Sequence, residues 1–233
     1  MGKPVCAVVG VGPGNGAAFA RRFAGAGYAV AALARGTATR SALAAELPDA
    51  RAYACDVADA GSIEAAFGAI RRDLGDPEVV VYNAGSGVWG TFDDVGLEQM
   101  EQAWRVNTAG LLLTGKQVVP AMKQRGRGAI LVVGATASLR GGARFTAFAA
   151  AKAAQRSLAQ SMARHLGPSG IHVALLIIDG MVNLTSTRQR FADLPDAAFL
   201  APDAIAEAGY QLVQQSPTAW TFELDLRPAI EKW

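Results

Sequence analysis

The chain has 233 residues, of which 51% are hydrophobic and 18% charged, and its formal net charge is +2. These values exclude a disordered chain, and they give no electrostatic reason to expect a nucleic-acid or membrane partner. No apolar run approaches the roughly 18 residues that a membrane-spanning helix needs. The two cysteines, Cys6 and Cys55, lie in apolar contexts without CxxC spacing. This pattern favours two buried thiols in a reducing cytoplasm over a disulfide framework, and no metal site is expected.

Short apolar runs alternate along the chain with longer, alanine-rich segments. We expect strands at 5–9, 28–34, 50–55, 79–82, 129–133, 172–178 and 220–226. We expect helices at 16–26, 41–47, 62–74, 97–125, 145–166 and 204–214. Ser62 is the expected N-cap of its helix, and Gly110 and Pro120 are the expected irregularities of the 97–125 helix. The stretch 181–201 has weak periodicity and is predicted to be a mobile loop with a short helix.

This alternation of strands and helices predicts an α/β protein. The expected fold is a single Rossmann-like doubly wound parallel sheet of about seven strands, with helices on both faces and right-handed crossovers. Because no linker, repeat or low-complexity segment divides the sequence, residues 1–233 are expected to form one domain.

A glycine-rich segment follows the first expected strand and precedes the first helix. Glycine at such a turn lets the backbone approach a pyrophosphate, whose charge is stabilised by the N-terminus of the helix. Glycine loops also occur as plain turns, but this position in a doubly wound pattern favours dinucleotide binding. The residues concerned are Gly10, Gly12, Pro13, Gly14, Asn15 and Gly16.

The end of the second expected strand bears on the choice of dinucleotide. NAD-binding proteins usually place an acidic residue here to accept the ribose 2′-hydroxyl, whereas this chain has Ala34 followed by Arg35. A guanidinium can pair with a 2′-phosphate. We therefore expect NADP(H) rather than NAD(H), although Arg35 could also be a solvated residue at the end of a strand.

Several motifs in the same order give the chain a resemblance to the short-chain dehydrogenase/reductase family. The glycine loop is similar to the family's TGxxxGxG pattern, with Val9 in place of the threonine. Tyr82-Asn83-Ala84-Gly85 is similar to the NNAG motif, and Asp179-Gly180-Met181-Val182 stands at the Pro-Gly turn beside the nicotinamide. The resemblance implies further cofactor contacts from Asp56, Val57, Asn83, Ala84, Gly85, Lys152, Gly180 and Val182.

The resemblance fails at the expected catalytic centre. Family members use a tyrosine four residues before a lysine, and a serine thirteen residues before that tyrosine. Lys152 is present, but the two other positions hold Phe148 and Ala135. A phenyl ring has no proton to donate and a methyl group makes no hydrogen bond. The enoyl-reductase variant of the family, with its tyrosine seven residues before the lysine, finds Phe145 there.

The resemblance leaves Lys152 and Asn107 as the expected catalytic residues, since Asn107 occupies the place of the family's helix-kinking asparagine. Other proton donors are weaker candidates: Ser86, Thr136 and Ser138 on loops that should border the cleft, and Tyr82 at a strand end. Trp89 is either a wall of an apolar substrate pocket or an ordinary packing residue. His165 and His172 are expected to be structural and remote from the cofactor.

Two functions follow from this sequence. The first is an NADP(H)-dependent oxidoreductase that acts on a small apolar carbonyl or alcohol through a non-standard site. The alternative is a catalytically silent NADP(H)-binding module that serves as a sensor or structural subunit. The small residues from Ala147 to Ala154, continued by Met162 and Leu166, also suggest a homodimer or homotetramer, although a monomer core gives the same pattern.

Overall fold

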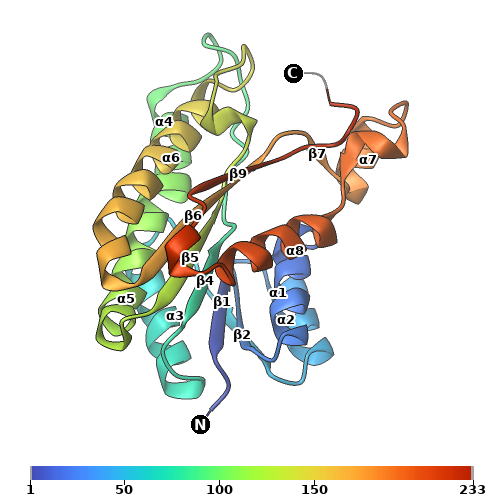
Figure 1. Cartoon of the computed structure of the whole chain (residues 1–233). Coiled ribbons are helices and arrows are strands. Elements are labelled where there is room, and N and C mark those ends of the chain that lie inside the picture. Colours follow the sequence, from blue (N-terminus) through green and yellow to red (C-terminus); the bar gives the residue numbers. More distant parts are fainter. Residues whose placement is uncertain (1, 232–233) are drawn as a thin grey trace.

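The computed structural model describes residues 2–231, and at its centre lies a seven-stranded parallel sheet (Figure 1). The strand order is β3-β2-β1-β4-β5-β6-β9, and every neighbouring pair is parallel. This confirms the predicted doubly wound α/β architecture. The strands are β1 (Val5–Val9), β2 (Ala29–Ala34), β3 (Ala50–Ala54), β4 (Val79–Tyr82), β5 (Gly128–Val133), β6 (Ile171–Ile178) and β9 (Glu223–Leu226).

Helices cover both faces of the sheet. Figure 1 shows α3 to α6 on one face and α1, α2 and α8 on the other. Alternating residues of a strand point to opposite faces, and in β1 they divide between two core clusters, with Ala7 in one and Val8 in the other. The helices are α1 (Asn15–Gly25), α2 (Thr37–Glu46), α3 (Ala60–Asp73), α4 (Leu97–Trp104), α5 (Gly110–Arg125), α6 (Thr146–Leu166), α7 (Thr185–Arg190) and α8 (Pro202–Val213).

The N-cap of α3 differs from the prediction. The helix begins at Ala60, and the carboxylate of Asp59 accepts hydrogen bonds from the backbone N–H groups of Gly61 and Ser62. The Ser62 hydroxyl instead accepts a hydrogen bond from the backbone N–H of Asp56 at 2.9 Å. Both residues are good caps, but the Asp59 carboxylate lies one turn earlier and binds two free amides.

The predicted 97–125 helix is divided rather than continuous. Between α4 and α5 lies a π-helical segment, η1 (Arg105–Ala109), that contains Asn107. Pro120 lies within α5 without ending it. Gly110 begins α5 directly above the sheet, where an added Cβ would lie 2.3 Å from the Tyr82 hydroxyl. The close approach of helix and sheet therefore requires glycine at this position.

The stretch 181–201 has more regular structure than predicted. It contains α7, a short 3-10 turn (Asp196–Ala198), and a parallel pair formed by β7 (Met181–Val182) and β8 (Phe199–Leu200). Two-residue strands are too short to show a period in the sequence. In Figure 1, α7 lies near the carboxyl ends of the sheet strands, beyond the end of α8. No helix within residues 2–231 is long and apolar enough to span a membrane.

Candidate dinucleotide and substrate site

The glycine loop is anchored to the carboxyl ends of β1, β2 and β4. The backbone N–H groups of Gly10 and Val11 both donate to the Leu33 carbonyl, and Asn83 Nδ2 donates to the Gly10 carbonyl at 2.7 Å. Gly10 has a φ of +91°, and an added Cβ would lie 2.5 Å from the Ala84 nitrogen. The glycine is needed here both for backbone conformation and for space.

The beginning of α1 has the properties of an anion-binding helix N-terminus. Its N-cap is Gly14, no described side chain caps the helix, and the first turn contains no acidic residue. The first amides of a helix have no partner within the helix, so they can bind a phosphate. Asn15 Oδ1 is buried without a hydrogen-bond partner. At Gly12 an added Cβ would meet no atom within 4 Å, so the loop has open space beside it. These residues fit a pyrophosphate.

A smaller cavity of about 280 Å³ is lined in part by this loop. It is lined by Gly10, Gly12, Arg35, Asp56, Val57, Asn83, Ala84 and Gly85, among others. The Asp56 carboxylate accepts a hydrogen bond from the backbone N–H of Ala58, which fixes the orientation of the side chain. Arg35 is exposed. The structure therefore brings Arg35, Asp56 and Val57 to one cavity with residues of the glycine loop.

A larger cavity of about 710 Å³ shares Asn83 and Gly85 with the smaller one as lining residues. Its volume is in the range of pockets that bind small molecules. Asn15, Ala135, Phe148, Lys152, Gly180 and Val182 all line it, whereas Asn107 does not. Asn107 lies just behind, since a Cβ added at Gly85 would be 3.4 Å from Asn107 Oδ1 and 3.8 Å from Lys152 Nζ.

Lys152 is held at the base of the larger cavity by neutral acceptors. Its Nζ donates to the Val133 carbonyl at 2.8 Å and to Gln155 Oε1 at 2.9 Å. Only 5% of the residue is exposed. Burial without a neighbouring carboxylate disfavours the ammonium form and lowers the pKa of Lys152 to about 7. The amine can therefore exchange a proton near neutral pH.

The usual serine and tyrosine positions face the cavity without a hydroxyl. The Phe148 ring centroid lies 6.0 Å from Lys152 Nζ, and Ala135 lines the same wall. Because Phe148 and Lys152 are four residues apart on α6, they share a helix face. The cavity thus keeps the lysine and lacks its two expected partners.

Comparison with known proteins identifies this architecture. The family model described as short chain dehydrogenase matches residues 4–194. The chain belongs to the short-chain dehydrogenase family. The structure of a short-chain dehydrogenase from Rhodopseudomonas palustris is 34% identical, with a TM-score of 0.83 and coverage of 97% of this chain and 98% of that chain. The alcohol dehydrogenase from Thermococcus sibiricus, complexed with 5-hydroxy-NADP, is 27% identical, with a TM-score of 0.87 and 98% of each chain covered.

A third similar protein is a dehydrogenase whose name describes it as inactive. It is the "Inactive 2-(S)-hydroxypropyl-CoM dehydrogenase 2" of Xanthobacter autotrophicus. It is 32% identical over 208 residues, which are 83% of this chain and 90% of the relative.

For this short-chain dehydrogenase, the other candidate proton donors separate into two groups. Tyr82 is fully buried and its hydroxyl donates to the Val106 carbonyl at 2.5 Å, while Ser138 is buried and its hydroxyl accepts from the Ala135 N–H. Neither side chain lines the larger cavity, although the loop that carries Ser138 does so through Thr136 and Ala137. Ser86 and Thr136 do line it.

The hydroxyls of Ser86 and Thr136 are engaged differently. The Thr136 hydroxyl donates to Asp179 Oδ1 at 2.6 Å, so its proton is committed to a carboxylate. The Ser86 hydroxyl accepts from Asn107 Nδ2 at 3.3 Å. Ser86 therefore retains a proton that can be donated.

His172 stacks on Trp220 and lines neither the smaller nor the larger of these two cavities, in agreement with its expected structural role.

Asp179 stands at the position of the family's turn proline, and its carboxylate binds residues of two other segments. Its carboxylate is 7% exposed and lies 3.4 Å from the Arg227 guanidinium and 4.0 Å from that of Arg140. The hydrogen bond from Thr136 completes its contacts with the loop after β5. Gly180 follows with a φ of +148°, and an added Cβ would be 2.8 Å from Pro228 Cδ. Asp179 thus joins the cavity wall to the segment after β9.

Sequence reasoning missed Gln155, whose side chain connects both expected catalytic residues. Its Nε2 donates to the Asn107 carbonyl at 2.7 Å, while its Oε1 accepts from Lys152. The sequence did contain a signal for Gln155. It is a polar residue one helical turn after Lys152, on a helix face that otherwise carries small or apolar side chains. Sequence reasoning also missed Arg140, Arg144 and Arg190, which come from separate segments and line the larger cavity together.

Proposed function

We propose that this protein is an NADP(H)-dependent oxidoreductase that acts on a small carbonyl or alcohol compound with an apolar body. The observation that carries this proposal is that the cavity at Arg35 and the cavity at Lys152 share Asn83 and Gly85 as lining residues. A dinucleotide whose pyrophosphate lies at the N-terminus of α1 would extend from the Arg35 side to the Lys152 side. Its reactive end would then share the larger cavity with a substrate.

The choice of NADP(H) over NAD(H) rests on the charge around Arg35. Arg35 directly precedes Gly36, the N-cap of α2, which has no side-chain cap among the described residues and no acidic residue in its first turn. A guanidinium beside a free helix N-terminus suits a 2′-phosphate. The related Thermococcus sibiricus enzyme is described with 5-hydroxy-NADP, in accord with this proposal.

The residues of the larger cavity provide a route for the proton of the reaction. NADPH, when bound, supplies a hydride to the carbonyl carbon, and the carbonyl oxygen then requires a proton. Lys152 Nζ exchanges protons near neutral pH and has two of its three N–H positions fixed by Val133 and Gln155. A group whose pKa is close to the working pH is well suited to general acid catalysis. Ser86 is the hydroxyl alternative in the cavity, because the Thr136 hydroxyl donates its proton to Asp179.

A second function is favoured by one specific observation. Positions 135 and 148 both lack a hydroxyl while the dinucleotide cavity is intact. This combination fits a module that binds NADP(H) without turnover and reports or stabilises occupancy. The relative whose name begins with "Inactive" is consistent with such an outcome.

One titration distinguishes the two functions. Purified protein is titrated with NADPH and with NADH by calorimetry, and the saturated sample is then mixed with a panel of aldehydes, ketones and quinones. Tight NADPH binding with substrate-dependent NADPH oxidation, abolished in Lys152→Ala, supports the oxidoreductase. NADPH binding without oxidation above the rate of a protein-free sample supports the silent module. If neither NADPH nor NADH binds, both proposed functions are overturned.

A homodimer or homotetramer and a cytoplasmic location belong to the same proposal. On α6, Leu166 is buried and the partly buried Met162 packs against the core of the same chain, so the apolar face that these residues continue is partly covered within the chain. Exposed apolar side chains lie instead on α4 and α5, where Trp104 is 49% and Leu112 is 42% exposed, and they support self-association.

The proposed cytoplasmic location is supported by the cysteines. Cys6 and Cys55 are free, buried thiols, which suits a reducing compartment.

A further inference from the structure

The charged side chains that line the larger cavity are all of one sign. Among the described residues these are Lys152 at its base and Arg140, Arg144 and Arg190, with no aspartate or glutamate. The arginines come from the loop after β5, the segment before α6 and the end of α7. They are all exposed at the residue level, whereas Lys152 is buried. The cavity is therefore positive both at its mouth and at its base.

Nearby carboxylates neutralise this charge only in part. The described residues contain no ion pair of Arg144 or Arg190. The Arg140 guanidinium lies 4.0 Å from an Asp179 carboxylate that also pairs with Arg227. Asp94 is close enough to Arg144 to interact electrostatically, but its hydrogen bonds go to Thr91. Like charges gathered at one opening repel each other, and an anion bound between them removes that cost.

A continuous aromatic wall connects the two ends of the cavity. The Arg190 guanidinium lies 4.5 Å from the Trp89 ring centroid, and the Trp89 and Phe145 centroids are 5.7 Å apart. The Phe145 and Phe148 ring centroids are 6.4 Å apart, and the Phe148 centroid lies 6.0 Å from Lys152 Nζ. The backbone fixes this order, because the Gly90 N–H donates to the Arg144 carbonyl and Gly90 pairs with Phe145.

We propose that the substrate of this cavity is an amphipathic anion, with a carboxylate, sulfonate or phosphate group at the end opposite its carbonyl or alcohol. Arg144 and Arg190, assisted by Arg140, bind the anionic group at the mouth. Trp89, Phe145 and Phe148 pack against the apolar body, and the reacting oxygen reaches Lys152. Arginine suits this role because its planar guanidinium can donate two parallel hydrogen bonds to an oxyanion. The proposal deepens the oxidoreductase function and rests on it for the reacting group only.

The test compares aromatic aldehydes that differ only in their para substituent. The anionic probes are para-formylbenzoate, para-formylbenzenesulfonate and para-formylphenyl phosphate, and the neutral ones are benzaldehyde and methyl para-formylbenzoate. Affinity is measured by calorimetry on the protein saturated with NADP⁺ and on the protein without nucleotide, and NADPH oxidation is followed separately. Binding therefore tests the anion site even if the protein does not turn over.

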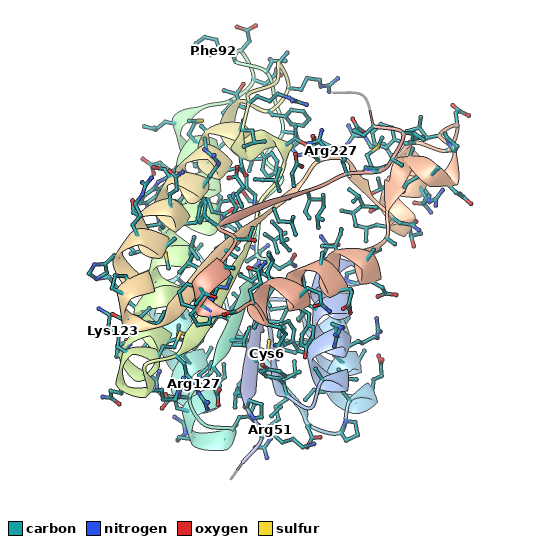
Figure 2. All side chains as sticks on the ribbon, viewed as in Figure 1. Cys6, Arg51, Phe92, Lys123, Arg127 and Arg227 are labelled. Carbon is teal, nitrogen blue, oxygen red and sulfur yellow. The ribbon has the colours of Figure 1, made fainter. Side chains whose placement is uncertain are left out.

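The matched variants are Arg144→Gln/Arg190→Gln and, as a control, Arg127→Gln. Figure 2 shows Arg127 at the end of the molecule opposite Phe92 and Arg227, and its ion pair is with Glu78. At least one anionic probe should bind the wild-type protein at least roughly tenfold more tightly than the neutral pair, since hydrogen bonds to charged groups contribute that much. The double variant should lose this preference, and Arg127→Gln should keep it.

Each outcome decides the proposal. The anionic probe that binds most tightly shows whether the site prefers a carboxylate, a sulfonate or a phosphate. Equal binding of anionic and neutral probes, no binding by any probe at millimolar concentration, or a preference that persists in the double variant overturns the anion site. A preference without any NADPH oxidation supports the anion site while contradicting the oxidoreductase.

Discussion

The buried side chain of Gln155 bridges Lys152 Nζ, which donates to its Oε1 at 2.9 Å, and the Asn107 carbonyl, to which its Nε2 donates at 2.7 Å. Gln155 is fully buried on α6, and Asn107 lies in the π-helical segment η1. One amide thus connects the helix that carries the lysine to the helix irregularity that borders the cavity. We interpret Gln155 as a positioning residue, because it acts on Lys152 and does not line the cavity.

Removing this bridge should destabilise the protein strongly. In Gln155→Leu, a buried carbonyl and a buried amine each lose a partner, and each unsatisfied group costs about 1–3 kcal/mol. The free energy of unfolding, measured by urea denaturation at pH 8, should fall by roughly 2–4 kcal/mol. Gln124→Leu, at an exposed position of α5, is the control and should change it by under about 0.5 kcal/mol. Equal effects of the two substitutions would contradict the bridge.

Burial of Lys152 predicts a specific pH dependence of stability. Because the pKa of Lys152 falls from 10.5 to about 7 in the folded protein, the unfolded chain binds more protons at this site between those values. This group therefore makes the protein more stable as the pH rises through that window. The free energy of unfolding of wild type minus that of Lys152→Met should rise by about 2 kcal/mol between pH 7 and pH 9.

The comparison with Lys152→Met isolates one group, since all other titrating residues are common to both proteins. Lys123→Met, at an exposed lysine on α5 (Figure 2), controls for loss of a lysine charge. A wild-type minus Lys152→Met difference that stays constant or falls with rising pH would show that the buried amine keeps its ordinary pKa.

Arg35 should determine the preference for NADPH. In Arg35→Ala the 2′-phosphate loses a charged partner, so the dissociation constant for NADPH should rise roughly ten- to a hundredfold. NADH has no such phosphate, and its affinity should be unchanged. Arg40→Ala is the matched control, because the Arg40 guanidinium donates to the Gly36 carbonyl and to Thr37. Calorimetry with both nucleotides measures the effect, and equal losses for NADPH and NADH would refute the assignment.

Restoring the missing hydroxyls should increase turnover. In Ala135→Ser/Phe148→Tyr the cavity regains a hydroxyl beside Lys152, and a positioned general acid contributes typically about a hundredfold or more. We expect kcat for NADPH oxidation to rise at least roughly tenfold with the best substrate of the panel. Ala137→Ser adds a hydroxyl elsewhere in the same cavity and should not reproduce the gain. No increase in the double variant would show that proton donation does not limit the wild-type protein.

The sheet and the glycine loop could be predicted because their signals are local. Strands such as Val5–Val9 and Val79–Tyr82 are uninterrupted apolar runs buried on both faces, and their observed bounds are those predicted. The order of the phosphate loop, the helix and Arg35 along the chain likewise follows from the βαβ unit. These features depend on residues that are neighbours in the sequence.

What could not be predicted depends on contacts between distant segments. Gln155 acquires its role from Asn107, 48 positions away, and Trp89 is placed between Arg190 and Phe145 by the folding of three separate segments. The β7–β8 pair is too short for any periodic signal. At α3 two good caps compete, and the helix takes Asp59 because its carboxylate binds two free amides. That last competition is local, between two capping residues three positions apart.

The most direct test of the account is NADPH binding to Gly12→Val. An added side chain at Gly12 meets no atom of the protein within 4 Å, so the fold should be retained, but the new methyl groups would occupy the space that a pyrophosphate needs. Gly25→Ala, a glycine of α1 with equally open surroundings, is the control. Calorimetry should show NADPH binding to wild type and Gly25→Ala, with affinity at least roughly tenfold weaker in Gly12→Val. Equal NADPH affinity in all three proteins, or no binding to any of them, would contradict a dinucleotide at the glycine loop.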